Sequence, residues 1–268
     1  MDGRVNGSLS GLNGGLRGSL SGLNDLNGSV GGSGGAGRLG GRPEALIFDM
    51  DGTLFQTETV AVPAYLSAFE KLREEGTIAG GEPRVKELLA SLGMLLEDIW
   101  RRVLPDEPEA VRARMNEVFL EEQMALLARG AGRLYPGVAE TLRLLKDAGC
   151  RLFVASNGLE RYVKGVAERT GIAPLFEGLY SAGEFRTNSK TQLVALLLRR
   201  HGLLRDGAAS AWMVGDRSSD VEAGRANGLP VVGCAYAAFG VSEDELRGAD
   251  VRISRFAELA ALFEARPS

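Results

Sequence analysis

Apolar runs and amphipathic segments alternate along most of the chain after residue 42. The stretch 45–49 begins with four consecutive apolar positions, which is typical of a strand buried on both faces. Further strands are predicted at 151–155, 178–181, 211–214, 231–234 and 251–253, and helices at 138–148, 161–170, 191–200, 220–227 and 257–264. Strands that alternate with helices of about ten residues predict an α/β fold with a doubly wound, Rossmann-like parallel sheet.

The segment between the first two predicted strands has a different pattern. Amphipathic spacing there predicts helices at 60–75, 83–92, 95–103 and 109–128, and no strand-like run occurs among them. We therefore expect an inserted all-helical cap domain at 59–130. The catalytic core would then consist of 43–58 and 131–268.

The first 42 residues are of low complexity. Fifteen of them are glycine, and the heptapeptide at 7–13 recurs at 18–24. Glycine loses the most backbone entropy when it is ordered, so a flexible Gly-rich tail is predicted. The leucines of this segment recur at helical spacing, and a weak helix that docks elsewhere is the alternative.

Composition and charge narrow the class of protein. Apolar residues make up 44% of the chain, charged residues 25%, and the net charge is −4, which argues against a strongly basic face for nucleic acid. No apolar stretch approaches the roughly 18 residues that a membrane span needs, and the first residues lack a signal pattern. Cys150 and Cys234 form no metal-binding or redox motif. We therefore expect a cytoplasmic enzyme with two buried, reduced cysteines.

The single histidine, His201, limits the possible chemistry. It follows two arginines and precedes a glycine, so it is predicted to lie at a helix C-terminus, where it interacts favourably with the helix dipole. No partner for a Ser-His-Asp or Cys-His mechanism lies near it in the sequence. A structural role is expected.

Two carboxylates stand directly after the first predicted strand. Asp49 and Asp51 lie one residue apart at its carboxyl end, where open α/β sheets bind ligands, and Gly52-Thr53 breaks the run. Acids crowded in this way repel each other unless a cation lies between them or one takes a proton. The pattern indicates a metal-assisted carboxylate nucleophile beside a general acid.

Polar residues also follow other predicted strands. Ser156 and Asn157 come after the second strand, where a hydroxyl and backbone N–H groups could hold phosphoryl oxygens; a helix N-cap is the alternative for the serine. Lys190 opens a predicted helix, and a cation there opposes the helix dipole. It could neutralise a phosphate, although a surface lysine is the ordinary interpretation.

A second acidic pair follows the strand at 211–214. Asp216 stands at the strand tip, and Asp220 four residues later could simply favour the first turn of a helix. That explanation does not account for Asp216. Four carboxylates at strand ends suit a hard cation, and we expect Mg²⁺, which also binds substrate phosphate.

Together these motifs resemble the haloacid dehalogenase superfamily, in its phosphatase branch. The specific signature appears as Asp49-Met50-Asp51-Gly52-Thr53, and the second acidic motif is matched by Gly215, Asp216 and Asp220. The resemblance covers about residues 45–265. With the helical insertion after the first motif, the chain resembles the phosphoglycolate phosphatase-like branch.

The resemblance implies a phosphomonoester hydrolase that acts on a small phosphorylated metabolite. Asp49 would form an aspartyl-phosphate and Asp51 would serve as general acid and base. Mg²⁺ would be held by Asp49, the backbone carbonyl of Asp51 and Asp216, with Asp220 in support. The groups that would hold the transferred phosphoryl oxygens are Ser156, Lys190 and the amides of Gly52, Thr53 and Asn157.

Other functions remain open at this stage. A sugar phosphomutase of the β-phosphoglucomutase type would use the same intermediate, but this chain lacks the cap histidine and the Glu-Asp of such relatives. A dehalogenase would have no leaving oxygen for Asp51 to protonate. A binding module gains nothing from two unneutralised acids. Phosphoglycolate, a nucleoside monophosphate and a sugar phosphate are all possible substrates.

Several cap residues could contact a substrate. Arg84, Arg101 and Arg102 could meet an anionic substrate, although solvated helix positions are the simpler expectation. Trp100 and Phe119 are expected in the core of the cap.

Overall fold

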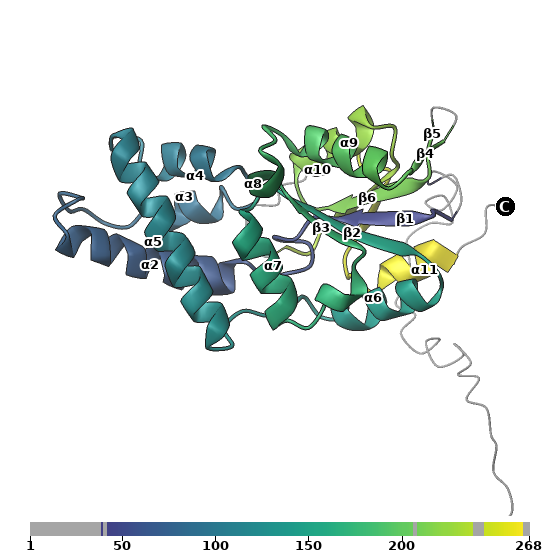
Figure 1. Cartoon of the computed structure of the whole chain (residues 1–268), viewed down its shortest axis with the longest axis horizontal. Helices are drawn as coiled ribbons and strands as arrows, with labels where there is room; N and C mark the ends of the chain where they lie inside the picture. The colour runs from purple at the N-terminus through teal and green to yellow at the C-terminus, as the bar shows by residue number, and fades with distance from the viewer. Residues whose placement is uncertain (1–38, 40–41, 206–207, 238–243, 265–268) are drawn as a thin grey trace, which may run out of the picture. The chain divides into compact units, whose positions relative to one another are not determined.

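A six-stranded parallel sheet lies at the centre of the larger part of the described chain (Figure 1). The computed structural model describes residues 39, 42–205, 208–237 and 244–264. In spatial order the strands are β3 (Gly178–Ser181), β2 (Arg151–Ser156), β1 (Ala45–Phe48), β6 (Ala211–Gly215), β7 (Val231–Cys234) and β8 (Val251–Ile253). Each neighbouring pair in this sheet is parallel. The chain runs outward from β1 to β3 and then returns to β6 on the other side of β1, which creates a topological switch point there.

The central strand is buried on both faces, as its apolar run predicts. Leu46 and Phe48 belong to one hydrophobic cluster, whereas Ala45 and Ile47 belong to another. Helices cover both faces. The first cluster includes side chains of α6 (Val138–Asp147), α7 (Glu160–Arg169) and α11 (Glu258–Glu264), and the second includes side chains of α9 (Lys190–Arg200) and α10 (Ser218–Ala226). The predicted doubly wound α/β fold is confirmed.

Four helices between β1 and β2 form their own hydrophobic cluster. They are α2 (Glu58–Glu74), α3 (Val85–Leu89), α4 (Leu96–Val103) and α5 (Glu109–Ala128). The cluster centres on aromatic contacts: the Trp100 ring lies 5.1 Å from the Phe119 ring and 6.2 Å from the Tyr65 ring. The helices therefore pack around a separate core, and we refer to them as the cap.

Some predicted boundaries differ from the structure. The helix predicted at 83–92 covers only Val85–Leu89, because Arg84 has a non-helical backbone conformation and the chain turns after Ala90. Short elements were not predicted. These are the turn of 3₁₀-helix η2 (Ala173–Leu175), the helix α8 (Ala182–Phe185) and the antiparallel ribbon of β4 (Leu204–Arg205) and β5 (Ala208–Ala209).

The predicted tail, 1–42, lies outside the described residues except at Leu39 and Arg42. Leu39 is buried, and its carbonyl accepts a hydrogen bond from Trp212 Nε1 at 3.1 Å. Arg42 lies over the Phe263 ring at 4.3 Å and donates to the carbonyl of Ala148. These two residues therefore contact the core.

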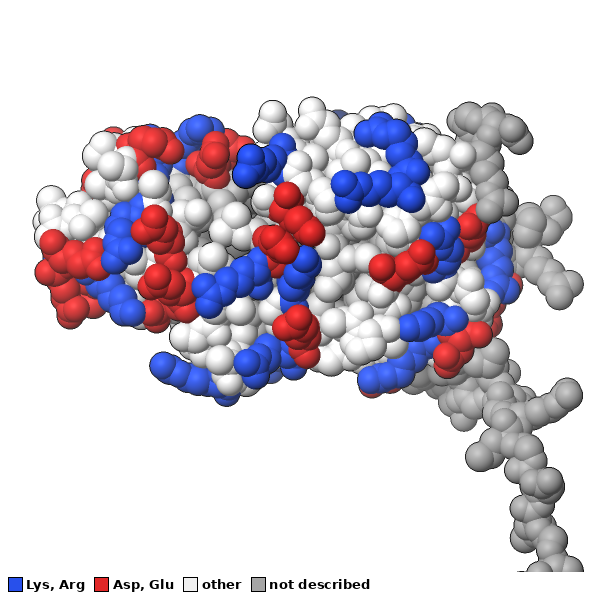
Figure 2. All heavy atoms as spheres, in the orientation of Figure 1, with Lys and Arg blue, Asp and Glu red and all other residues white. Residues whose placement is uncertain are grey.

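Other sequence expectations can be compared with the structure. Cys150 and Cys234 are free and buried. His201 follows α9, and its ring contacts Phe153 and the Tyr180 hydroxyl. None of the described helices is both long and apolar enough to span a bilayer. Figure 2 shows positive and negative side chains intermixed over the face that it displays.

Candidate active site

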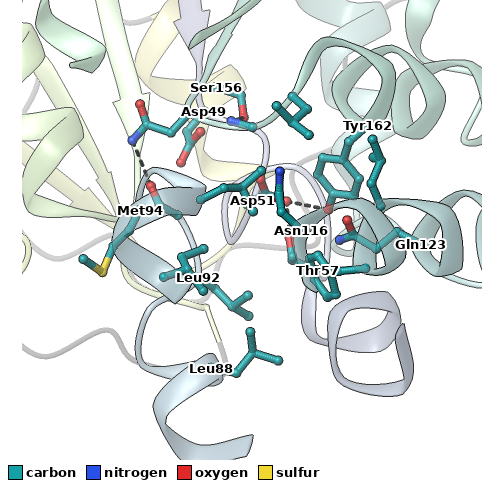
Figure 3. Close-up of a pocket in the computed structure, with 18 residues that line it drawn as sticks. Asp49, Asp51, Thr57, Leu88, Leu92, Met94, Asn116, Gln123, Ser156 and Tyr162 are labelled. Carbon is teal, nitrogen blue, oxygen red and sulfur yellow. Dashed lines mark hydrogen bonds between the residues drawn. The ribbon is translucent and has the colours of Figure 1, made fainter. Parts of the chain in front are cut away.

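The predicted polar residues meet at the carboxyl ends of the central strands. Asp49 follows β1, Ser156 is the last residue of β2, Asp216 follows β6, and Lys190 is the first residue of α9. Figure 3 shows Asp49, Asp51 and Ser156 converging on one pocket. Because the strands are parallel and adjacent, residues far apart in the sequence are brought to the same edge of the sheet.

Lys190 bridges two of the acids. Its Nζ lies 2.9 Å from Asp49 Oδ1 and 2.6 Å from Asp220 Oδ1. All three side chains are almost fully buried. The second oxygen of Asp220 accepts the backbone N–H of Arg217 at 2.9 Å, so both carboxylate oxygens of Asp220 have partners. The lysine is thus a buried counter-ion rather than a surface residue.

Asp216 is positioned by the turn that follows β1. Thr53 Oγ1 donates to Asp216 Oδ1 at 2.9 Å. Gly52 lies against the same carboxylate with a φ of +80°, and a Cβ on this residue would be 2.3 Å from Asp216 Oδ2. Only glycine allows both the positive φ and this close approach. Gly52 and Thr53, which follow the first acidic pair, therefore position Asp216 of the second pair.

Burial and neighbouring negative charges raise the pKa values of Asp49 and Asp216. Burial raises the pKa of Asp49 well above its usual range, Lys190 opposes this rise, and Asp220 and Asp216 add to it. Burial, followed by the charge of Asp220, raises the pKa of Asp216 to about 7. Burial alone would lower the pKa of Lys190, but Asp220 and Asp49 raise it overall, so the ammonium stays charged. The site needs further positive charge to hold all its acids ionised.

Asp51 has two partners that sequence reasoning missed. Its Oδ1 accepts a hydrogen bond from Tyr162 at 2.7 Å and from Thr57 at 2.5 Å. Burial raises the pKa of Asp51, and both hydrogen bonds oppose that rise. Figure 3 shows Tyr162 and Thr57 beside Asp51. No motif marks Tyr162; a signal was its position on the predicted helix that follows Ser156.

The predicted phosphate-binding groups differ in their surroundings. Ser156 is buried and its Oγ accepts the N–H of Gly158. The N–H of Gly52 donates to the Phe55 carbonyl at 3.0 Å and is used within the turn. The N–H groups of Thr53 and Asn157 have no hydrogen-bond partner among the described residues.

The Asn157 side chain links the core to the cap. Its Nδ2 donates to the carbonyl of Gly93 at 2.9 Å, and its Oδ1 is buried with no hydrogen-bond partner in the described part of the chain. Gly93 lies between α3 and α4. Sequence reasoning assigned Asn157 to phosphate binding and did not anticipate this contact.

The acids fit a divalent cation. Asp49, Asp216 and Asp220 each offer one carboxylate oxygen, and these oxygens all lie within 4.8 Å of one another. The Oδ2 atoms of Asp49 and Asp216 are buried and have no hydrogen-bond partner among the described residues. Arg217 Nε lies 3.4 Å from the latter oxygen as an ion pair. Buried carboxylate oxygens in this state are costly unless a cation binds them.

A cavity of about 40 Å³ extends from Asp49 and Asp51 into the cap. Cap residues from α3, α4 and α5 line one side, and Ser156 and Tyr162 line the other. The acids thus lie at one end of a partly open pocket.

Comparisons with known proteins agree with this geometry. Residues 43–228 match the model of the haloacid dehalogenase-like hydrolases. The chain belongs to that family. The probable phosphatase IndB of Dickeya dadantii is 29% identical over 210 residues, which cover 78% of this chain and 87% of that protein. A phosphoglycolate phosphatase of Nitrosococcus oceani is 30% identical over 202 residues, 73% and 85% of the two chains.

A solved structure has the same fold. CbbY of Rhodobacter sphaeroides, in complex with phosphate, matches with a TM-score of 0.70 and 24% identity over 83% of this chain and all of that one. The expected haloacid dehalogenase assignment in its phosphoglycolate phosphatase-like branch is confirmed, as is the prediction of a phosphatase.

Proposed function

We propose that this haloacid dehalogenase-like hydrolase is a Mg²⁺-dependent phosphomonoesterase that forms an aspartyl-phosphate on Asp49. The observation that carries the proposal is the asymmetry of the Asp49 carboxylate. Its Oδ1 is held by Lys190 and by the N–H of Met50, whereas its Oδ2 is buried and accepts no hydrogen bond from the described residues. A carboxylate fixed in this way is oriented for attack.

Asp51 is the proposed general acid and base. In the first step an Asp49 oxygen bonds to phosphorus, the bond from phosphorus to the ester oxygen breaks, and Asp51 gives its proton to that oxygen. In the second step Asp51 takes a proton from water, whose oxygen bonds to phosphorus as the Asp49–phosphorus bond breaks. Burial raises the pKa of Asp51, which favours the protonated form that the first step needs.

The proposed Mg²⁺ ligands are Asp49, the Asp51 backbone carbonyl and Asp216, with Asp220 in support. When bound, the ion supplies positive charge that lowers the repulsion between the acids and the phosphate. Thr53 and Gly52 hold Asp216 in place, and the paired oxygens of Asp220 position Lys190.

The proposed phosphate contacts are Lys190, Ser156 and backbone N–H groups of the two turns. Lys190 stays charged and lies 2.9 Å from Asp49 Oδ1, so it can also face the phosphoryl oxygens. The N–H groups of Thr53 and Asn157 are candidate donors. The cytoplasm is the proposed compartment, because both cysteines are free thiols.

Hydrolysis of p-nitrophenyl phosphate tests this function. We expect turnover with Mg²⁺ that a chelator removes, and a loss of about 10³-fold or more in Asp49→Asn. Asp147→Asn, an exposed position on α6, should remain active and is the matched control. Metal-independent turnover, or full activity of Asp49→Asn, would contradict the proposal.

The same preparation tests the mutase alternative. A mutase would interconvert hexose phosphates faster than it releases phosphate. We expect phosphate release, since the named relatives at 29–30% identity are phosphatases and the chain's single histidine contacts Phe153 and Tyr180 rather than the pocket.

A further inference from the structure

We propose that the leaving group of the physiological substrate is uncharged and largely apolar. This inference rests on the proposed function and identifies the class of phosphomonoester. It is carried by the lining of the pocket above Asp49 and Asp51. The proposed general acid must reach the leaving oxygen, and Asp51 lines this pocket but not the neighbouring hollow beside Lys190.

The cap side of the pocket is mostly hydrocarbon. Figure 3 shows Leu88 and Leu92 below the acids in this view. Ile99 and Phe119 also line the hollow. Apolar side chains that line a pocket favour a ligand that buries apolar surface against them.

The pocket has no positive charge for an anionic leaving group. Among the described residues that line it, none is Lys, Arg or His. Two of the lining residues, Asp49 and Asp51, are acids. A carboxylate or second phosphate on the leaving group would therefore be buried without a counter-ion among the residues that line the pocket, which is strongly unfavourable.

The nearest cations do not line this pocket, although Lys190 lies 2.9 Å from Asp49 Oδ1. Arg84 and Arg101 pair with acids of their own helices or turns and do not line the pocket. Arg102 lines a neighbouring hollow, where Lys190 and Arg217 are also found. That hollow shares Leu92, Gly93, Met94 and Asn157 with the pocket, so these residues form the wall between the two.

The polar groups of the cap wall are neutral. Asn116 and Gln123 both lie on α5, and Figure 3 shows them on the same side as Tyr162. Asn116 Oδ1 accepts a hydrogen bond from Trp100 Nε1 at 3.1 Å, which orients the amide and leaves its NH₂ for a ligand. The Gln123 side chain has no hydrogen-bond partner among the described residues. Two carboxamides suit a neutral oxygen, such as a hydroxyl, an ether or a carbonyl.

The inference separates this chain from relatives that are named phosphoglycolate phosphatases. The leaving group of phosphoglycolate carries a carboxylate. Selection of an anion requires a cation or a well-placed set of donors at the far end of the pocket. The described lining offers two carboxamides and hydrocarbon there instead.

Two substrates of similar shape test the inference. Phenyl phosphate and 4-carboxyphenyl phosphate have leaving oxygens of comparable basicity, and they differ by one carboxylate. We expect kcat/KM to be about 100-fold or more higher for phenyl phosphate. Phosphoglycolate should be as poor a substrate as the carboxylated ester. Equal values, or a preference for the carboxylate, with both activities lost in Asp49→Asn, would overturn the inference and leave the proposed function standing.

A variant that adds charge inside the pocket tests the cause. Gln123→Arg should reduce the preference for phenyl phosphate by about tenfold or more, because it supplies the missing counter-ion. Ala128→Arg adds the same charge at an exposed position of α5 and should leave the ratio unchanged. If Gln123→Arg does not fold, the ratio measured with the unmodified chain decides. Absence of Asp49-dependent hydrolysis of either ester would instead refute the proposed function, and this inference with it.

Discussion

The Tyr162 hydroxyl donates a hydrogen bond of 2.7 Å to Asp51 Oδ1, although the two residues are 111 positions apart in the chain. Tyr162 lies on α7 of the core and is buried. Burial, followed by the charge of Asp51, raises the pKa of Tyr162 well above its usual range, so the phenol keeps its proton and remains a donor. Asp51 is therefore held from two sides, by α7 and by Thr57.

Removal of this hydroxyl should slow the step that needs an acid. In Tyr162→Phe we expect kcat to fall about tenfold with phenyl phosphate, because one of the two hydrogen bonds that position Asp51 is lost. The fall should be smaller with p-nitrophenyl phosphate, whose leaving group needs less protonation. Tyr180→Phe, which removes a hydroxyl that contacts His201, is the control. Equal losses with both esters would argue against a role through Asp51.

Metal binding should be measurable without turnover. We expect Mg²⁺ to raise the melting temperature of the unmodified chain, because a ligand that binds only the folded state stabilises it. In Asp216→Asn this rise should disappear, since a buried carboxylate oxygen that accepts no hydrogen bond is replaced by a neutral group. Asp147→Asn should keep the rise. A full Mg²⁺ response in Asp216→Asn would exclude this residue as a ligand.

The glycine after Asp51 offers a test of packing at the site. Gly52→Ala should destabilise the fold by about 2 kcal/mol or more beyond the effect of Gly76→Ala. Both glycines have a positive φ, of 80° and 70°, but a Cβ at Gly52 would be 2.3 Å from Asp216 Oδ2, whereas a Cβ at Gly76 would have no atom within 4 Å. Urea unfolding of the two variants measures the difference. Similar values would show that the turn accommodates the methyl group.

The link between core and cap should affect binding more than chemistry. Asn157→Ala removes the hydrogen bond to the Gly93 carbonyl but keeps the backbone N–H. We expect KM for p-nitrophenyl phosphate to rise about three- to tenfold with a smaller change in kcat, because a hydrogen bond of about 1 kcal/mol that closes the pocket is lost. Asn188→Ala, at an exposed position before α9, is the control. A loss confined to kcat would point to a direct role of Asn157 in the reaction.

The thiols should resist reagents in the folded protein over a wide pH range. Burial raises the pKa of Cys150 to about 12 and raises that of Cys234 as well. A raised thiol pKa means that the reactive thiolate is scarce below that value, so we expect neither residue to react readily with a disulfide reagent at pH 8. After denaturation both should react. Rapid reaction of the native chain would show that one thiol is accessible.

The sequence predicted the features that depend on sheet topology. An apolar run followed by Asp49 and Asp51 indicates a buried strand and acids at its end, and parallel strands bring Asp216 and Lys190 to the same edge. The bounds of β3 and α5 agree with the prediction, and those of α5 follow from the breakers Pro108 and Gly130 that flank it. The acidic motifs also predicted the phosphatase branch of the haloacid dehalogenase family.

The missed contacts depend on how elements pack. The Tyr162–Asp51 bond requires the orientation of α7 against the turn after β1, and the Asn157–Gly93 bond requires the position of the cap. Neither leaves a pattern in one sequence. The helix predicted at 83–92 is present but shorter, because apolar spacing does not show where the backbone leaves the helical conformation at Arg84 and after Ala90. The neutral lining of the pocket likewise depends on how α3, α4 and α5 pack together, which one sequence does not specify.

The buried side chains around Trp100 and Tyr65 form a cluster of their own, separate from those on the two faces of the sheet. Substitutions on α3, α4 or α5 can therefore change the shape of the cap side of the pocket while the buried acids and Lys190 keep their positions. In a protein built this way, evolution can change which phosphate esters are bound by altering the cap alone. The residues proposed to break the ester bond need not change.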